Sequence, residues 1–446
     1  SKSNHIRVDF SVEQFSMVPV NVKGASMVSV EMPGVFLPGD EGAPNLPGQG
    51  RFIAIPTGAT PVLRIVNSRV EVIQNVDIAP APRIPLESED TPLDYTKNSA
   101  IYSSNEFYPA EPVKLSEVSS VRGVDFVTLG ITPFQYNPVT KELRVIRDLE
   151  VAIDLVGGNG EFGDAAFRNR YWDPMLSDML LNYSSLPRID YKSRYENSAN
   201  RKAADECEYI IITPDGPEFQ AWADTIRKFR TEQGVITKVF TITEVGGNTT
   251  TAIQNFIKNA YNNWTLKPVA CLLLGDHGSD GTKNLLAPIY DNYCVSDNLY
   301  ADVNGDMMPD VVMSRITANN NDQLTVMITK FLNYERNPPT AEYFYKHPIT
   351  ALGWQTERWF QICSEVVGGY FKHVQGKEPV RINKVYQGTP GSVWSTATNT
   401  NTVVNYFGPN GLGYIPQSPA ELGGWDGGNA TDRKSTRLNS SHVALS

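Results

Sequence analysis

The stretch "EYIIITPDGPEFQAWADTIRKFRTEQGVITKVFTI", from Glu208 to Ile242, decides the fold class. It begins with an apolar, β-branched run that is typical of a buried strand. A helical segment follows and stops at Gly234, and "VITKVFTI" reads as a second strand. One face of the intervening helix is apolar and carries Phe219, Trp222, Ile226 and Phe229. Because parallel neighbours need a crossover, this order predicts a parallel sheet covered by helices.

The same alternation continues towards the carboxyl terminus. "TAIQNFIKNAYNNW" repeats the helical period and leads into the strand "PVACLLLG", and "PDVVMSRI" is a further strand followed by another helix. A second series begins at "HPITALGW". We therefore expect a complete α/β unit over residues 206–345 and the start of a second, incomplete one over residues 346–431.

The first third of the chain has a different pattern. Short β-branched runs such as "TPVLRIV" and "VEVIQNVDI" are separated by Pro and Gly turns, with no helical period between them. The run "ELRVIRDLEVAIDL" carries apolar residues at alternate positions, namely Leu143, Val145, Leu149, Val151 and Ile153. Alternation predicts strands with one buried face, so we expect an antiparallel β-sandwich over residues 1–155. The regularity fades over residues 156–205, which we interpret as a linker.

Composition narrows the possible functions. The 446 residues carry 39 Lys and Arg against 49 Asp and Glu, a net charge of −10, and no basic cluster. Nucleic acid is therefore disfavoured as a partner, because binding phosphates needs clustered cations. No apolar run approaches the roughly 20 residues that span a bilayer. The four cysteines show neither CxxC spacing nor the density of a disulfide scaffold, and are interpreted as free or structural thiols. They are Cys207, Cys271, Cys294 and Cys363.

An acidic loop, "YADVNGDMMPD", precedes the strand "PDVVMSRI". Its spacing matches the early half of an EF-hand-type calcium loop without the final Glu. The loop positions are Asp302, Asn304, Asp306, the Met308 carbonyl and Asp310. Carboxylates about 4 Å apart repel by roughly 4 kcal/mol at an effective dielectric near 20, so converging acids need a cation. Asp276, at the end of a neighbouring strand, is a candidate for the missing carboxylate. The alternative is a solvated acidic turn.

The His-Gly pair at His277 follows a buried strand, as a catalytic histidine does in some cysteine peptidases. Such an enzyme also needs a thiolate within reach of the imidazole, normally at the end of the next strand. The next cysteine, Cys294, lies in a polar loop with no strand leading to it. We therefore expect a surface role for His277, with a Cys294/His277 pair as the rival interpretation. "GTPGSVWS" lacks the strand and helix of a nucleophile elbow.

The chain resembles the gingipain family of cysteine endopeptidases over most of its length. The phrases "GAPNLPGQGRFIAIPTGA", "NEFYPAEPVKLSEVSSVRG" and "ITPFQYNPVTKELRVIRDLEVAIDL" are similar to the family's propeptide. "EYIIITP", "LLLGDHG", "YADVNGDMMPDVVMSRI" and "FLNYERNP" are similar to its first peptidase unit. The resemblance implies two caspase-like units side by side, preceded by a sandwich propeptide that acts as an intramolecular inhibitor.

The resemblance also implies a structural calcium ion (Ca²⁺) in the first unit. Carried over residue by residue, its ligands are Asp276, Asp306 and Asp310, with Val303 and Met308 through carbonyls. Asp302 and Asn304 are added from the loop spacing alone. The family's catalytic His and Cys belong to the second unit, beyond "YFGPNGLGYIP", so no catalytic residue is named in this chain. We expect the chain as given to be inactive.

The implied activity is hydrolysis of peptide bonds in protein or peptide substrates, by thiolate attack with His as acid and base. The implied context is a secreted or surface-bound bacterial zymogen, cut in the linker at Arg194, Arg201 or Lys202. The alternative is a non-catalytic, calcium-binding surface or adhesion protein. Residues 432–446 break from the preceding pattern, and Asp-Arg-Lys-Ser fits a translated sequencing adapter, so we expect a non-native tail there.

Overall fold

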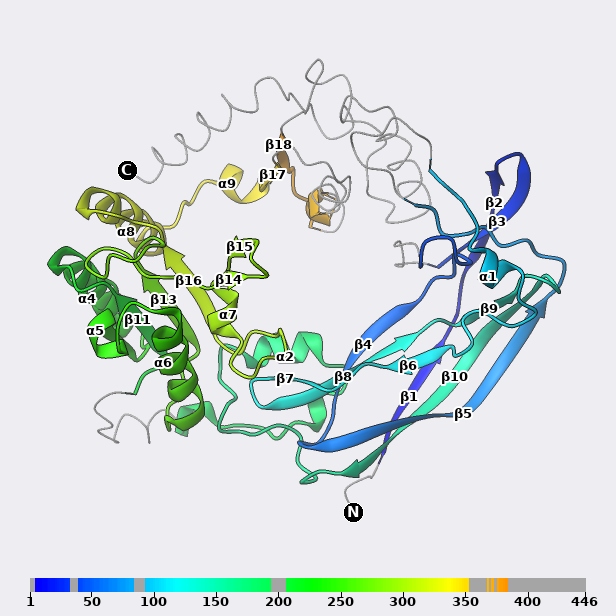
Figure 1. Ribbon diagram of the computed structural model, residues 1–446, viewed down its shortest axis with the longest axis horizontal. Helices are drawn as coiled ribbons and strands as arrows, with labels where there is room; N and C mark the ends of the chain where they lie inside the picture. Colours follow the sequence, from blue (N-terminus) through cyan, green and yellow to red (C-terminus); the bar gives the residue numbers. More distant parts are fainter. Residues whose placement is uncertain are drawn as a thin grey trace.

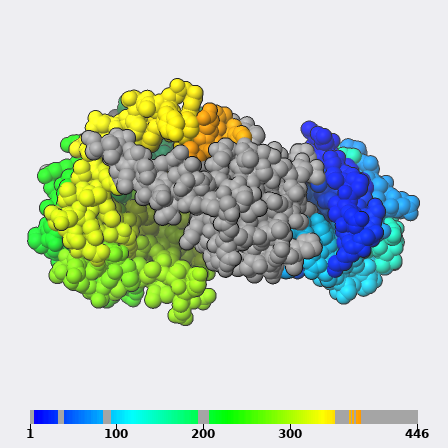
Figure 2. Space-filling model, turned by 90° about the horizontal axis from the view of Figure 1, so that it is seen from above, coloured from blue at the N-terminus to red at the C-terminus, as the bar shows by residue number. Residues whose placement is uncertain are grey.

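A computed structural model of the protein describes residues 5–32, 39–83, 93–193, 206–352, 367–368, 370–372 and 375–383. The amino-terminal part is built from strands, and the part after residue 206 alternates strands and helices (Figure 1). In the space-filling view the first strands, in blue, and the α/β part, in green and yellow, lie at opposite ends (Figure 2). The change of pattern read from the sequence is therefore a change of architecture.

Two antiparallel sheets form the body of the amino-terminal part. The first has the order β1-β10-β5, and β9 also pairs with β10. Its strands are β1 (His5–Ser11), β5 (Ala59–Ile73), β9 (Phe134–Asn137) and β10 (Glu142–Gly157). The second has the order β4-β8-β6, and β7 also pairs with β8. Its strands are β4 (Gln49–Ala54), β6 (Val113–Leu115), β7 (Ser119–Val121) and β8 (Val124–Ile131). The expected antiparallel β structure is confirmed.

Buried residues from both sheets meet in one core, which makes the pair a sandwich. Val8, Val151 and Ile153 of the first sheet pack with Ile53 and Val127 of the second. A separate hairpin, β2 (Ser16–Val22) with β3 (Ala25–Glu31), and a short helix, α1 (Ser99–Tyr102), lie outside the two sheets.

Strand β10 contributes to two cores rather than one. Leu143 and Val145 pack in a cluster with Phe134, whereas Leu149 and Val151 pack between the two sheets. The register against β5 shifts between Ile146 and Asp148 and again between Glu150 and Val151. Such bulges rotate a strand locally, so the simple alternation expected from the sequence is interrupted midway.

The α/β unit contains a four-stranded parallel sheet of order β12-β11-β13-β16. Its strands are β11 (Tyr209–Thr213), β12 (Thr237–Thr241), β13 (Ala270–Leu274) and β16 (Val312–Ile316). The main helices are α4 (Pro217–Glu232), α5 (Ile242–Val245), α6 (Thr250–Asn263) and α8 (Asn321–Arg336). The parallel sheet expected after residue 206 is confirmed.

Helices cover both faces of this sheet. Phe219 and Ile226 of α4 and Ile328 of α8 pack with Ile211 on one face. Ile253 of α6 packs on the other face with residues of α5 and of β11 and β13. Successive residues of a strand face opposite sides of the sheet, and helices cover both sides here. Each strand is therefore apolar along its whole length.

The region interpreted as a linker is partly structured. Helix α2 (Asp173–Met179) places Trp172, Leu176 and Leu180 in a buried cluster with Phe126 of the sandwich and Val269 of the α/β unit. Seven residues are too few to show a helical period, so the pattern of residues 156–205 did not indicate this helix. Residues 194–205, with the candidate cleavage positions, lie outside the described residues.

The remaining described elements are short. They are β14 (Ile289–Tyr290), β15 (Cys294–Val295), α7 (Asn298–Ala301), α9 (Glu342–Lys346), β17 (Ile349–Leu352) and β18 (Val380–Asn383). Strands β17 and β18 pair in parallel, as expected for the start of a second unit. Cys363 and the tail at 432–446 lie outside the described residues. Among the described helices, none has the length and hydropathy of a membrane span.

Candidate functional site

The acidic loop is folded around the carboxylate of Asp302. This carboxylate accepts hydrogen bonds from the backbone amides of Gly305 at 2.6 Å, Asp306 at 3.2 Å and Met307 at 3.0 Å. Asn304 Oδ1 accepts a further bond from the Asp306 amide at 3.0 Å. Short polar side chains stabilise turns in this way, and here they wrap the loop into a compact unit before β16.

Two carboxylates of the loop point to the sandwich. Asp306 Oδ2 accepts a hydrogen bond from the amide of Ser120 in β7 at 2.8 Å. Asp310 Oδ1 accepts from the Arg122 amide at 3.3 Å and from the Tyr261 hydroxyl at 3.0 Å. Asp310 is 2% exposed, and burial raises its pKa above the usual range. The loop therefore binds the backbone of a hairpin that lies about 190 positions earlier in the chain.

That hairpin joins β7 and β8 through a two-residue turn, Arg122 and Gly123. Both residues have positive φ, 50° and 72°, as a type I′ turn requires. Asn or Gly is the usual residue at the first position, because a larger side chain is strained there. An arginine in this conformation indicates that its side chain makes interactions that offset the strain.

The Arg122 side chain is inserted into the α/β unit and is 1% exposed. Its Nη1 donates hydrogen bonds to the carbonyl oxygens of Pro268 at 2.9 Å and Asp310 at 3.1 Å. The guanidinium also lies 5.2 Å from the ring of Tyr261 and 5.8 Å from the ring of Trp172. Our sequence analysis missed this residue, although the turn "VRGV" between two apolar runs was a local signal for the hairpin.

The structure does not bring Asp276 to the acidic loop. The Asp276 amide donates to the carbonyl of Ala318, eight residues beyond Asp310 along the neighbouring strand. At about 3.3 Å per residue the two aspartates are roughly 25 Å apart, at opposite edges of the sheet. The Asp276 carboxylate instead accepts from the His277 amide and from Asn319 Nδ2, each at 2.8 Å.

The seven predicted ligands therefore do not fit one calcium site. Asp302, Val303, Asn304, Asp306, Met308 and Asp310 stay within one loop. Among the described residues, no three His, Cys, Asp or Glu side chains are grouped closely enough to hold a metal ion. Each ionised carboxylate of the loop has more lone pairs than the hydrogen bonds it accepts, so lone pairs remain that could bind a cation. Calcium binding by the loop alone stays a prediction.

The described cysteines and His277 do not form a catalytic pair. His277 is exposed, and its Nδ1 accepts a hydrogen bond from the Ala287 amide at 3.0 Å. Burial raises the pKa of the Cys207 thiol to about 12, and burial also raises that of Cys271. A nucleophilic cysteine needs the opposite shift. Cys294 is exposed on the β14-β15 hairpin, and no hydrogen bond joins it to His277 in the described part of the chain.

Two family models match the chain. The propeptide model of family C25 matches residues 1–163, and the model of peptidase family C25 matches residues 202–415. The boundary between them falls in the region that separates the sandwich from the α/β unit. The docked hairpin therefore comes from the part that matches the propeptide, and the acidic loop from the part that matches the peptidase.

Curated relatives from Porphyromonas gingivalis agree with the two models. Lys-gingipain is 26% identical over 363 residues, which are 77% of this chain and 20% of that protein. Gingipain R2 is 24% identical over 343 residues, which are 75% of this chain and 44% of that protein. The chain thus spans between a fifth and less than half of the length of these relatives.

Solved structures are similar over shorter stretches. A complex of the RgpB pro- and mature domains from Porphyromonas gingivalis has a TM-score of 0.37 at 22% identity, covering 42% of this chain and 94% of that one. A structure on the zymogenic latency of gingipain K from Porphyromonas gingivalis has a TM-score of 0.29 at 28% identity, covering 34% of this chain and 86% of that one. On the two family models and the curated relatives, the chain belongs to the gingipain-like cysteine peptidases of family C25 and carries the family's propeptide.

Proposed function

We propose that the protein is part of a secreted gingipain-like cysteine endopeptidase in its latent form, with the sandwich acting as an intramolecular inhibitor. One observation carries the proposal. A hairpin of the propeptide-matching region buries Arg122 in the peptidase-matching region, with two carbonyl acceptors and two aromatic rings around it. A contact of this kind holds the two units together independently of the segment that connects them.

The chemistry proposed for the family is hydrolysis of peptide bonds in protein or peptide substrates. A thiolate attacks the scissile carbonyl, a histidine exchanges the proton, and backbone amides hold the oxyanion. Three observations support a catalytic pair outside the described residues. The buried thiols of Cys207 and Cys271 have raised pKa values, the Nδ1 of His277 accepts from the Ala287 amide, and Cys294 is exposed on the β14-β15 hairpin. We therefore propose that the described part positions and regulates a catalytic pair located elsewhere.

Limited trypsin digestion tests the latent complex. Arg194, Arg201 and Lys202 lie between the two units, so a brief digest should nick the chain there. We expect the two halves to stay associated on size exclusion, and to separate when Arg122 is replaced by Asn. Separation of the nicked wild-type halves would refute the proposal. Arg51 is the matched control for loss of an arginine on the sandwich, because its guanidinium donates hydrogen bonds to Gly50 and Gln49 of its own strand.

A direct assay addresses the catalytic part of the proposal. The purified protein is incubated with casein, with and without a thiol-alkylating reagent. We expect no hydrolysis that the reagent suppresses. Thiol-dependent hydrolysis that disappears in Cys294→Ala would overturn the assignment and favour the Cys294/His277 pair.

We further propose that the acidic loop binds a structural calcium ion through Asp302, Asn304 and Asp306. The support is the loop spacing and the oxygen-rich set of side chains in one turn, which suits a hard cation. A ligand that binds only the folded state raises its stability by mass action. The melting temperature should therefore rise with calcium in the wild type and not in Asp302→Asn.

The control for the calcium experiment is Asp280→Asn. Asp280 is also an exposed loop aspartate, and it caps its own turn by accepting from the amide and hydroxyl of Thr282. This variant should keep the calcium response of the wild type. If millimolar calcium leaves the wild-type melting temperature unchanged, the metal proposal fails while the latent-complex proposal stands.

A further inference from the structure

Strand β5 is an exposed edge of the sandwich. It is the last strand in the order β1-β10-β5, and it is 15 residues long. Among the described residues it pairs on one side only, with β10. The border that it forms is visible along the lower edge of the sandwich in Figure 1. An unpaired edge presents a row of backbone N–H and C=O groups that can pair with another strand.

Folded proteins usually protect such edges with Pro, Lys, bulges or charges. In β5 the first half has two of these devices, Pro61 and the irregular position at Val66. The second half, from Asn67 to Ile73, has no Pro and no Lys, and the extra residue of the register shift opposite it belongs to β10. Only the charges of Arg69 and Glu71 remain to oppose pairing there.

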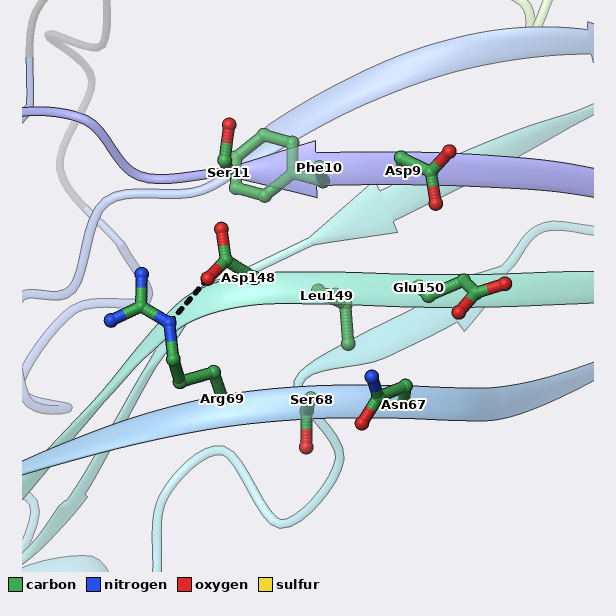
Figure 3. A pocket seen from close by; sticks show the side chains of 9 residues that line it. All are labelled: Asp9, Phe10, Ser11, Asn67, Ser68, Arg69, Asp148, Leu149 and Glu150. Atoms are coloured by element: carbon green, nitrogen blue, oxygen red, sulfur yellow. Dashed lines mark hydrogen bonds and ion pairs between the residues drawn. The ribbon is translucent and has the colours of Figure 1, made fainter.

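The two faces of this half-strand differ. Arg69 and Glu71 lie on one face, where they form ion pairs with Asp148 and Arg147 of β10. Figure 3 shows the ion pair of Arg69 with Asp148 as a dashed line. Successive residues alternate, so Val70 and Val72 lie on the other face. There Val70 is opposite the buried Ile146, and Val72 is opposite Arg144.

The side chains of Val70 and Val72 are incompletely covered. Val70 is 44% exposed and Val72 is 48% exposed, whereas Ile146, opposite Val70, is 3% exposed. Neither valine belongs to the core between the two sheets, although Leu63 in the first half of β5 packs against that core. Two apolar side chains therefore stand at the unpaired edge with no neighbouring strand to cover them.

We propose that a second copy of this chain pairs with β5 in antiparallel orientation, with the twofold axis at Val70. In this register Arg69 of one copy lies opposite Glu71 of the other, and the pair occurs twice. Val70 meets its own counterpart, and Val72 lies opposite Ser68. Directly opposed side chains of opposite charge stabilise an antiparallel pair. The charges that would protect this edge from other strands are thus complementary to themselves.

Neighbouring registers do not have this property. An axis at Glu71 would place two glutamates directly opposite each other, which is destabilising. A slip by one residue would oppose side chains that point to different faces. The complementarity is specific to the axis at Val70, and this specificity argues for a second copy as the occupant rather than an unrelated strand.

The expected dimer is weak. Seven paired residues bury far less than the roughly 1,600 Å² of a standard interface, so we expect dissociation in the micromolar range. Sedimentation equilibrium of the full chain, at concentrations up to the order of 100 µM, should show a reversible monomer–dimer equilibrium. A protein that remains monomeric over this range would overturn the proposal.

Val70→Lys places two cations at the axis and should abolish the dimer. Val62→Lys is the matched control, because Val62 is 49% exposed on the same strand but lies outside the paired segment. Circular dichroism verifies that both variants stay folded. If Val70→Lys dimerises as the wild type does, the interface lies elsewhere and the proposal is wrong.

Charge reversal provides a positive test. In Arg69→Glu, a glutamate at position 69 of one copy faces Glu71 of the other. In Glu71→Arg, two arginines face each other in the same way. Each variant alone should therefore be monomeric. In an equimolar mixture every position 69 faces an opposite charge at position 71, so a heterodimer should form with wild-type affinity to within about tenfold. Absence of association in the mixture, with both variants folded, would refute the register.

Discussion

Replacing Arg122 by Asn isolates the contribution of one side chain to the attachment of the sandwich. Asn favours positive φ, so the two-residue turn between β7 and β8 should keep its conformation in the free and docked states. What is lost is the guanidinium, with its hydrogen bonds to the Pro268 and Asp310 carbonyls and its contacts with two rings. The backbone bonds of Ser120 and Arg122 to the acidic loop remain.

The magnitude follows from burial. Each carbonyl left without its donor in a buried site costs about 1 kcal/mol or more, and each cation–ring contact contributes about 0.5–1 kcal/mol. The sum is about 3 kcal/mol, which corresponds to roughly a 100-fold weaker association of the trypsin-nicked halves. Titration of one separated half with the other, followed by isothermal calorimetry, measures this. If the affinity of the two halves falls by less than about tenfold, Arg122 fills space without stabilising the interface. Arg51→Ala should leave this affinity unchanged.

Three further predictions concern single groups. Because burial raises the pKa of Asp310, folding favours its protonated form. The stability of the wild type relative to Asp310→Asn, measured by urea unfolding, should therefore fall as pH rises above the unfolded pKa of 3.8 and through the raised pKa of the folded state. The Arg230 ion pair lowers the pKa of Glu335, so Glu335→Gln should cost about 1 kcal/mol at neutral pH. This difference should begin to decline as pH falls below the unfolded pKa of 4.5 and should be lost as pH falls through the lowered pKa of the folded state. Iodoacetamide should alkylate Cys294 in the native protein but Cys207 only after unfolding, as read by mass spectrometry, and equal rates would contradict the assigned burial.

The alternation of strands and helices after residue 206 was predictable because it has a local period. Phe219 and Ile226, spaced at helical intervals, lie in the core where the pattern placed them. Strands such as β11 are short apolar runs, and their parallel pairing follows from the helices between them. Sequence reasoning works here because neighbouring residues report on the same element.

The docking of the hairpin was not predictable in this way. Arg122 and Asp310 are 188 positions apart, and nothing in either segment reports on the other. The prediction that Asp276 joins the acidic loop failed for a different reason. It follows β13, whereas Asp310 precedes β16, and the two strands are parallel. A residue that follows one parallel strand lies at the carboxyl ends of the strands, whereas a residue that precedes its neighbour lies at the amino ends. The positions of Asp276 and Asp310 relative to these two strands therefore already placed them far apart.

The bulge at Arg147 lets β10 contribute to two cores with one alternating pattern of apolar residues. Leu143 and Leu149 serve different cores only because the strand changes its phase between them. They are six positions apart, so a strand of the same length without the bulge would place both on one face and turn one of the two apolar sets towards water. One extra backbone position therefore divides a single alternating pattern between two cores. Deleting that position would leave both sets facing their cores and would remove only the local bend that the bulge adds.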